Sequence, residues 1–282
     1  MRRGSEEIDV VMLTRNSERP FLDMCLKSIY ANIPVRRLIV IDGYSTDNSV
    51  QILKSYPRVS LVQMEGTRGA ARERGIEEVE TEWFAFVDSD VVLCKNWYAK
   101  ISPCLTESIG AVWGVAIPVA PSDLKRCTAM ARFYRRTLED TMLIEGNRRG
   151  MLHDTLIRTK LVKGIRIPRH LHVWEDHYIK QHVINRGCGW IATSKICCHH
   201  FADISARNIR DLIEFGKIAR AYGYYSWKRV LMFALLGLPK AAWIYALTGD
   251  MELSTWQLDA YRMIIAGWLA DGVKPQINQA GP

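Results

Sequence analysis

The stretch Trp83-Phe84-Ala85-Phe86-Val87-Asp88-Ser89-Asp90-Val91-Val92 decides the fold expected for this chain. Its first five residues are mostly aromatic or β-branched, which is typical of a buried strand. In an extended chain residues i and i+2 point to the same side, so Asp88 and Asp90 would project together from the carboxyl end of that strand. Open α/β sheets bind ligands at this end. Two hard oxygen ligands there suit Mg²⁺ or Mn²⁺ carrying a phosphorylated substrate, and a plain turn is the alternative.

The segments before this stretch alternate between strand and helix patterns. Short apolar runs predict strands at residues 8–14, 38–41, 59–62 and 83–87. Helices are expected after Arg19-Pro20 and at residues 48–55 and 67–79. This βαβαβαβ order with nearly continuous hydrophobic strands predicts an α/β fold, with a mostly parallel sheet and helices on both faces.

Polar residues follow three of the predicted strands. Thr14-Arg15-Asn16 follows the first, Asp42 ends the second, and Asp88 with Asp90 follows the fourth. Because the carboxyl ends of parallel strands meet at one edge, these side chains are expected to line one site. The glycine-rich signatures of the dinucleotide fold and of the P-loop are absent from the sequence, which disfavours both classes.

The charge of the chain points to an anionic partner. The 282 residues carry a net charge of +8, and residues 123–172 hold twelve Lys or Arg against five Asp or Glu. A nucleotide diphosphate, a lipid phosphate or acidic headgroups would suit that excess. The basic residues follow no nucleic-acid motif, so no nucleic acid is expected as partner, although charge-driven binding to nucleic acid is kept as a rival interpretation.

The seven cysteines are interpreted as structural, because they form no C-x-x-C pair and no zinc spacing. Cys197-Cys198-His199-His200 cannot converge on one ion, since neighbours on a strand face opposite ways. Residues 1–9 do not resemble a signal peptide, because the hydrophobic run at residues 10–13 is too short. The expectation is a chain that starts in the cytosol.

Four motifs together resemble those of family-2 inverting glycosyltransferases. Residues 40–47 (VIDGYSTD) resemble the V-D-D-G-S-T-D segment, residues 69–76 (GAARERGI) the A-R-N-x-G-I helix start, residues 87–90 (VDSD) the metal motif, and residues 174–176 (WED) with Gly187 the later E-D segment. Glu73 replaces the usual Asn of the second motif. The resemblance implies a Rossmann-like GT-A fold, with a catalytic domain over residues 1–202.

The resemblance also implies a donor site. Thr14 and Arg15 would flank the base of a nucleotide-diphosphate sugar, and Asp42 would bond the base or ribose, with turn formation as the alternative. Arg72 would help to hold the nucleotide, and Arg68 is a second candidate.

The implied metal is Mn²⁺ or Mg²⁺, which would stabilise the leaving nucleoside diphosphate. Asp90 would be its main ligand, and Asp88 would lie nearer the ribose or a metal-bound water. Relatives often add a third protein ligand, sometimes a Gln two residues after the motif; this chain has Val92 there, so the third ligand must come from elsewhere. His199 is the candidate for that role, with His200 as the alternative beside it.

Asp176 is the predicted catalytic base. Inverting transfer needs a group that takes a proton from the acceptor hydroxyl, and a carboxylate that begins a helix lies near its positive dipole end. Helix capping is the alternative interpretation. Trp174 could stack on an acceptor sugar, and Arg158, or the pair at residues 148–149, could neutralise a phosphate.

The C-terminal segment, residues 203–282, has a different pattern. Helical spacing runs from Ile204 to Ala219, and Val230–Gly249 holds twenty residues with Lys240 as the one charge. Trp256–Ala270 predicts an amphipathic helix. The apolar run would be a kinked span or a re-entrant hairpin, with a buried helical subdomain as the alternative. Resemblance to dolichol-phosphate sugar synthases and cellulose-synthase-like enzymes favours membrane attachment, with the catalytic domain on the cytoplasmic face of the cell membrane.

The function expected from the sequence is metal-dependent inverting transfer of a sugar to a hydroxyl of a lipid-linked sugar acceptor. The family resemblance implies mannose from GDP-mannose as the donor, on the frequency of that donor in the family alone. Direct glycosylation of a polyprenyl or dolichyl phosphate is the enzymatic alternative. A non-catalytic protein that binds nucleotide sugars or membranes is the alternative from another class.

Overall fold

The structure is a computed structural model that describes residues 7–18, 20–201 and 209–270. Contacts within the chain divide it into two units. The sheet unit comprises residues 1–117 and 142–201, and the helical unit comprises residues 118–141 and 202–282. The helical unit therefore takes in residues 118–141 in addition to the C-terminal segment predicted to form a domain.

The first half of the sheet consists of four parallel strands in the order β3-β2-β1-β4. These strands are β1 (Ile8–Thr14), β2 (Val35–Asp42), β3 (Val59–Gln63) and β4 (Trp83–Val87), connected through helices α1 (Phe21–Asn32), α2 (Ser49–Lys54) and α3 (Arg68–Glu78). All seven elements were predicted. The chain adds strands on one side of β1 and then crosses to the other, which creates a topological switch point between the carboxyl ends of β1 and β4.

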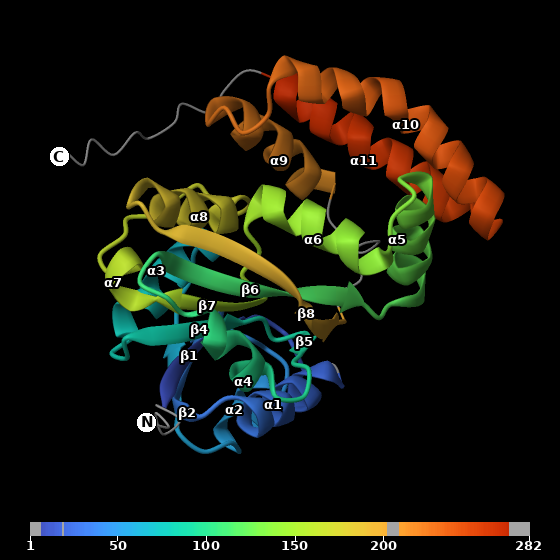
Figure 1. The fold of residues 1–282 in the computed structure, drawn as a ribbon. Coiled ribbons are helices and arrows are strands. Elements are labelled where there is room, and N and C mark those ends of the chain that lie inside the picture. Colours follow the sequence, from blue (N-terminus) through green and yellow to red (C-terminus); the bar gives the residue numbers. More distant parts are fainter. Residues whose placement is uncertain (1–6, 19, 202–208, 271–282) are drawn as a thin grey trace. The chain divides into compact units, whose positions relative to one another are not determined.

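Helices cover both faces of this parallel part (Figure 1). Met12 of β1 belongs to the same buried cluster as Leu22 and Leu26 of α1. Val11 points to the other face, where a Cβ on Gly75 of α3 would overlap its side chain. The close approach of α3 to the sheet therefore requires glycine at position 75.

The second half of the sheet contains antiparallel pairs. β7 (Asp154–Arg158) runs antiparallel to β4 and to β6 (Ile109–Pro118), and β8 (Gly189–His200) runs antiparallel to β5 (Val91–Val92). As a result β7 begins where β4 ends, and β8 ends beside β5. The remaining elements of the sheet unit are α4 (Trp97–Ile101), η1 (Ser102–Cys104), α7 (Thr159–Val162) and α8 (Glu175–Asn185), and α6 (Leu138–Arg149) leads back into it.

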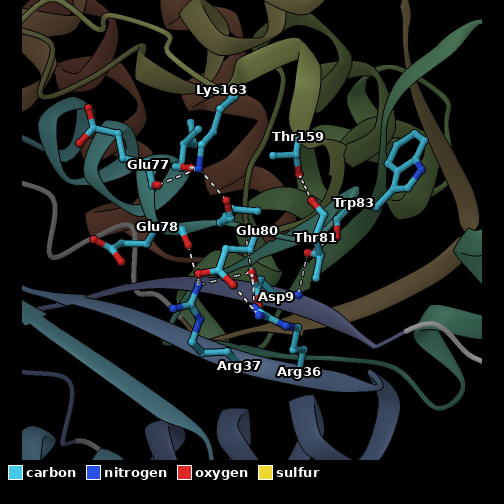
Figure 2. A network of polar contacts seen from close by, with 12 residues as sticks. Asp9, Arg36, Arg37, Glu77, Glu78, Glu80, Thr81, Trp83, Thr159 and Lys163 are labelled. Atoms are coloured by element: carbon cyan, nitrogen blue, oxygen red, sulfur yellow. Dashed lines mark hydrogen bonds and ion pairs between the residues drawn. The ribbon is translucent and has the colours of Figure 1, made fainter.

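A polar network ties the amino ends of the strands together (Figure 2). Asp9 of β1 is fully buried, and its carboxylate accepts hydrogen bonds from Arg36 Nη1 (3.1 Å) and from the backbone N–H of Glu80 (2.8 Å). Its own N–H donates to Thr81 Oγ1 (3.0 Å). Arg36 also pairs with the Glu80 carboxylate. This network lies at the edge opposite Asp88 and therefore stabilises the sheet rather than forming the site.

Replacing Asp9 by Ala is expected to lower the free energy of unfolding by about 2 kcal/mol, because it leaves the backbone N–H of Glu80 without its acceptor and removes the buried carboxylate that pairs with the partly exposed Arg36. Chemical denaturation measures the change. Glu7→Ala is the matched control, since the exposed Glu7–Arg58 pair (2.7 Å) is expected to contribute below about 1 kcal/mol. Equal losses for the two variants would contradict the role given to Asp9.

The helical unit contains α5 (Pro121–Phe133), α9 (Ile209–Ala221), α10 (Trp227–Thr248) and α11 (Met251–Leu269). Backbones of α9 and α11 meet closely at Gly216 and Gly267, where a Cβ would overlap main-chain atoms of the opposite helix. The helices expected near 209–219, 230–249 and 256–270 are present, while Ile204 and Asn208 lie outside the described residues. α10 continues through Pro239 as one helix, so the re-entrant hairpin is not formed.

Candidate active site

The residues Asp88-Ser89-Asp90 form a turn at the end of β4. Val91 N donates to Asp88 O (3.2 Å), which closes the turn, and Asp88 N donates to His153 O (3.1 Å) at the start of β7. The sequence predicted two aspartates side by side on an extended strand. Strand geometry ends at Val87, so the turn, and not strand alternation, sets the positions of the two carboxylates.

Arg72 of α3 holds the first of these carboxylates. Its Nη2 donates to Asp88 Oδ1 (2.6 Å), and its guanidinium lies over the Phe86 ring at 4.7 Å. Burial raises the pKa of Asp88, but the charge and hydrogen bond of Arg72, followed by His153 and His200, bring that pKa below its ordinary value. Arg72 is itself buried, and its Nε and Nη1 have no hydrogen-bond partner among the described residues.

The second carboxylate faces the end of β8. Asp90 Oδ1 lies 3.4 Å from His200 Nε2, and the two side chains are 38% and 30% exposed. Phe201 N donates to Asp90 O (2.9 Å), which fixes the turn against β8. His199, the residue predicted as a ligand, pairs with Val92 and is exposed on the opposite side of the strand from His200. The imidazole beside Asp90 is therefore that of His200.

A buried His–Asp pair, which the sequence analysis did not single out, lies next to this turn. His153 Nδ1 is 2.5 Å from Asp154 Oδ1, and Asp154 Oδ2 accepts hydrogen bonds from Trp97 Nε1 (3.1 Å) and Cys198 Sγ (3.2 Å). The rings of His153 and His200 are 6.0 Å apart. Adjacent His and Asp in the sequence were a usable signal, but only the antiparallel pairing of β7 with β4 brings them to the site.

The loops after β1 and β2 are tied together at the same edge. Asp42 is fully buried and accepts hydrogen bonds from Ser45 N (3.0 Å), Ser45 Oγ (2.5 Å) and Gln63 Nε2 (2.9 Å). The Arg15 side chain lies across Gly43, and the buried Thr14 hydroxyl has no partner among the described residues. Asp42 thus organises its loop, in keeping with the turn alternative, while Thr14 and Arg15 remain at the edge of the site.

Glu73 connects α3 to the segment that leads to α8. It is buried, and its carboxylate accepts hydrogen bonds from Ile167 N (2.6 Å), Arg166 Nη1 (3.1 Å) and Arg169 Nη2 (3.4 Å). Gly69 N donates to Leu171 O (3.0 Å) one turn earlier in the helix. A carboxylate can bind this basic segment, whereas the Asn usual at this position would offer one oxygen and no charge.

Asp176 begins α8 and is held from two sides. Arg149 Nη2 lies 2.9 Å from Asp176 Oδ2, and His177 N donates to Oδ1 (2.8 Å). Trp174 is 2% exposed, with the Arg149 guanidinium over its ring at 5.4 Å. The prediction that Trp174 stacks on an acceptor sugar is therefore wrong, because its ring is packed inside the protein and instead positions Arg149.

Glu175 was not predicted as a separate functional group. It is 5% exposed, and its Oε2 has no hydrogen-bond partner among the described residues. Burial raises the pKa of Glu175, the Asp176 charge raises it further, and Arg68, Arg72 and Arg149 only partly offset these effects. Glu175 and Asp176 are thus two adjacent carboxyl groups in different environments.

Arg158, one of the candidates for phosphate binding, is at the wrong end of the sheet. It pairs with Trp83 at the amino end of β4 and donates to the carbonyl oxygens of Glu107 (3.1 Å) and Thr106 (2.9 Å). Its guanidinium lies over the Trp83 ring at 4.7 Å. The antiparallel direction of β7 explains this placement, since it sends the last residue of β7 away from Asp88.

Replacing Glu175 by Gln is expected to stabilise the fold at neutral pH and to leave it unchanged in acid. A carboxyl whose pKa is raised by folding binds its proton more tightly in the folded state. The free energy of unfolding therefore falls as the pH rises above the pKa that this carboxyl has in the unfolded chain. The melting temperature of E175Q minus that of the wild type should therefore grow between about pH 4 and pH 7. A difference independent of pH would contradict the assignment.

The described residues present no group of three or more His, Cys, Asp or Glu assembled around a common metal position. Asp88, Asp90 and His200 nevertheless supply oxygen and nitrogen donors at one turn. Magnesium sites in nucleotide-binding enzymes commonly use one or two carboxylates and complete their shell with substrate phosphates and water. The donor set therefore fits a cation that arrives with a diphosphate.

These features define an α/β protein whose sheet begins with the strand order 3-2-1-4 and carries polar and charged side chains at its carboxyl edge. Residues 9–147 match the family model described as glycosyl transferase family 2. These residues therefore form a glycosyltransferase domain of this family, and the fold of the chain is that of GT-A glycosyltransferases. The uncharacterized glycosyltransferase YibD of Escherichia coli (strain K12) is 33% identical over 107 residues, which are 36% of this chain and 31% of that protein. The match thus spans about a third of that relative's length.

Solved structures of low identity share the fold. The mannosyltransferase PcManGT from Pyrobaculum calidifontis, in complex with GDP-Man and Mn²⁺, has a TM-score of 0.62 at 17% identity, over 94% of this chain and 87% of that one. Residues 1–349 of TarS from S. aureus have a TM-score of 0.55 at 17% identity, over 91% of this chain and 71% of that one. Glucosyl-3-phosphoglycerate synthase from Mycobacterium tuberculosis, in complex with Mn²⁺ and UDP, has a TM-score of 0.51 at 19% identity, over 82% of this chain and 78% of that one.

Proposed function

We propose that this protein transfers a sugar from a nucleotide-diphosphate donor with inversion, using Mn²⁺ or Mg²⁺ bound at Asp88 and Asp90. The observation that carries the proposal is the turn after β4, where two carboxylates, an imidazole and the buried Arg72 meet at the switch point of the sheet. When bound, the metal neutralises charge on the diphosphate that leaves. His200 replaces His199 as the proposed third protein ligand.

The donor is proposed to lie along the loops after β1, β2 and β4. Arg72 Nε and Nη1 are buried without partners among the described residues, and its Nη2 holds Asp88 at the turn, so its charge would suit a diphosphate oxygen there. The buried Thr14 hydroxyl likewise has no partner among the described residues, and Arg15 would flank the base. Asp42 would act mainly by shaping the loop that receives the ribose.

Asp176 is the proposed base. The proton of the acceptor hydroxyl passes to its carboxylate while the acceptor oxygen forms a bond to the anomeric carbon. The bond from that carbon to the diphosphate breaks, and its electron pair leaves with the nucleoside diphosphate. Arg149 and the His177 N–H fix the orientation of the carboxylate.

For the substrates, we propose mannose from GDP-mannose and a hydroxyl of a lipid-linked sugar. GDP-Man and Mn²⁺ are bound by the mannosyltransferase with the shared fold, whereas TarS binds UDP-GlcNAc. A polyprenyl phosphate acceptor is the second candidate. It is favoured by the ion pair of Asp176 with Arg149, because an acceptor that is already ionised needs no base.

The proposed location is the cytoplasmic face of the cell membrane. Among the described residues, α10 is the helix long and apolar enough to cross a bilayer, judged by length and composition. The basic excess of residues 123–172 would favour a surface rich in acidic headgroups.

Nucleoside diphosphates are expected to raise the melting temperature only when Mn²⁺ is present, and GDP more than UDP. At a concentration of about 100 times its Kd, a ligand raises the free energy of unfolding by about 2.7 kcal/mol. Asp90→Asn should abolish the part of the melting-temperature shift that requires Mn²⁺. Asp23→Asn, which removes an exposed ion pair on α1, should leave that shift unchanged. Absence of any nucleotide effect would favour a non-catalytic protein.

Asp176→Asn separates the two acceptor classes. With a hydroxyl acceptor, kcat should fall by about 10²- to 10⁴-fold while nucleotide binding persists, because the general base is lost. Transfer of radiolabelled sugar to each acceptor class measures the effect. Unchanged turnover would remove Asp176 as the base and would favour the polyprenyl phosphate.

A further inference from the structure

The outer side of α10 carries a stripe of exposed apolar side chains. The stripe comprises Trp227, Leu231, Leu235, Leu238 and Tyr245 at spacings of three, four and seven residues, and these side chains are 45–69% exposed. The opposite side is buried against α5 and α11 at Val230, Phe233, Gly237, Lys240, Ala241 and Ile244. A helix with one packed side and one exposed apolar side is typical of proteins that lie on membranes.

The partners of α10 argue against a spanning orientation. Buried Lys240 donates to the Tyr261 hydroxyl of α11 (2.8 Å) and lies over the Tyr134 ring at 5.1 Å. α11 packs along α10 and exposes Asp259 and Arg262 near its middle. If α10 crossed a bilayer, the charges of Asp259 and Arg262 would lie near the hydrocarbon core, and moving charged groups out of water costs free energy. An orientation parallel to the membrane plane leaves them in water.

A pocket of about 440 Å³ lies between α5 and the last turn of α10. Leu124 and Ala129 of α5 and Leu247 of α10 form its apolar wall. Lys125, Thr128 and Arg132 of α5 supply polar groups at helical spacing. Lys125 and Arg132 are exposed, and neither forms an ion pair with a carboxylate among the described residues.

The pocket is continuous with the helix that carries the apolar stripe. Leu247 lines the pocket and is itself 39% exposed, two residues after Tyr245 of the stripe. A ligand that fits both features has an anionic group for Lys125 and Arg132 and an apolar part that continues along α10. A phospholipid in the surface of a bilayer has this composition.

We propose that the helical unit docks on a membrane with α10 lying in the plane of the interface, and that the α5–α10 pocket receives the phosphate-bearing headgroup of an anionic phospholipid. This inference rests on the membrane attachment proposed above and gives it an orientation and a lipid class. It does not depend on the chemistry at Asp88 and Asp176.

Flotation of the full chain with vesicles tests the proposal. Binding is expected on phosphatidylcholine vesicles that contain about a third phosphatidylglycerol, and weaker binding on phosphatidylcholine alone. Lys125→Gln with Arg132→Gln should reduce binding to the anionic vesicles roughly 10- to 30-fold, the effect of two basic residues at an anionic surface. Leu235→Gln with Leu238→Gln should reduce binding to both kinds of vesicle.

The matched control removes two exposed cations of the sheet unit, Lys54→Gln with Lys160→Gln, and should leave the lipid preference intact. A second pocket variant, Thr128→Glu, places a negative charge between the two cations and should abolish the preference. Equal losses in the control and the pocket variant would show a general charge effect and overturn the pocket. Displacement of the vesicles by inorganic phosphate would identify a free-anion site and would also overturn it.

Nucleotide binding with Mn²⁺, measured on the same proteins by thermal shift, separates this inference from the proposed function. Wild-type protein that binds nucleotide but no vesicle refutes the docking surface and leaves glycosyl transfer standing. Protein that binds vesicles with the expected lipid preference but no nucleotide supports the docking surface and refutes the donor site.

Discussion

The ion pair between Arg72 and Asp88 is the interaction on which the candidate site depends. It joins α3 to the turn after β4, and the charge and hydrogen bond of Arg72 lower the pKa of the partly exposed Asp88 carboxyl, which burial alone would raise. The next residue, Glu73, binds the segment at residues 166–169 that precedes α8. One helix therefore positions the turn after β4 through Arg72 and the segment before α8 through Glu73, and a shift of α3 would move both.

Much of the fold could be predicted because the four parallel strands are buried on both faces. Such strands appear in the sequence as short hydrophobic runs, and the helices between them bury one side against the sheet, so each element carries its own periodic signal. The antiparallel half carries no comparable signal of direction. This is why Arg158 was expected at the site. The composition of residues 154–158 indicated a strand, but it did not indicate that this strand runs antiparallel to β4.

The candidate site shows the same division between local and long-range information. Asp88, Asp90 and Asp176 belong to short motifs that sequence resemblance can detect. The choice of His200 over His199 depends on the register between β5 and β8, and Arg149 from another helix contacts the Trp174 ring and acts on Glu175 through its charge. These are contacts between residues far apart in the chain. For the same reason the sequence assigned the helical unit to the C-terminal segment alone, without α5, which packs on α10.

The two edges of the sheet are built from similar residues with opposite consequences. At the amino edge, the charges of Asp9, Arg36 and Glu80 satisfy one another, although the Nε atoms of Arg37 and Arg158 are buried there without a hydrogen-bond partner among the described residues. At the carboxyl edge, Thr14, Arg72 and Glu175 keep buried polar atoms without partners among the described residues. Unsatisfied buried groups cost stability, and a ligand that supplies the missing partner is one explanation for them. Such atoms occur at both edges, so they do not by themselves distinguish the two. The difference lies in the charges: those of the amino edge pair with one another, whereas the carboxyl edge combines Arg72 with the partly exposed carboxylates of Asp88 and Asp90.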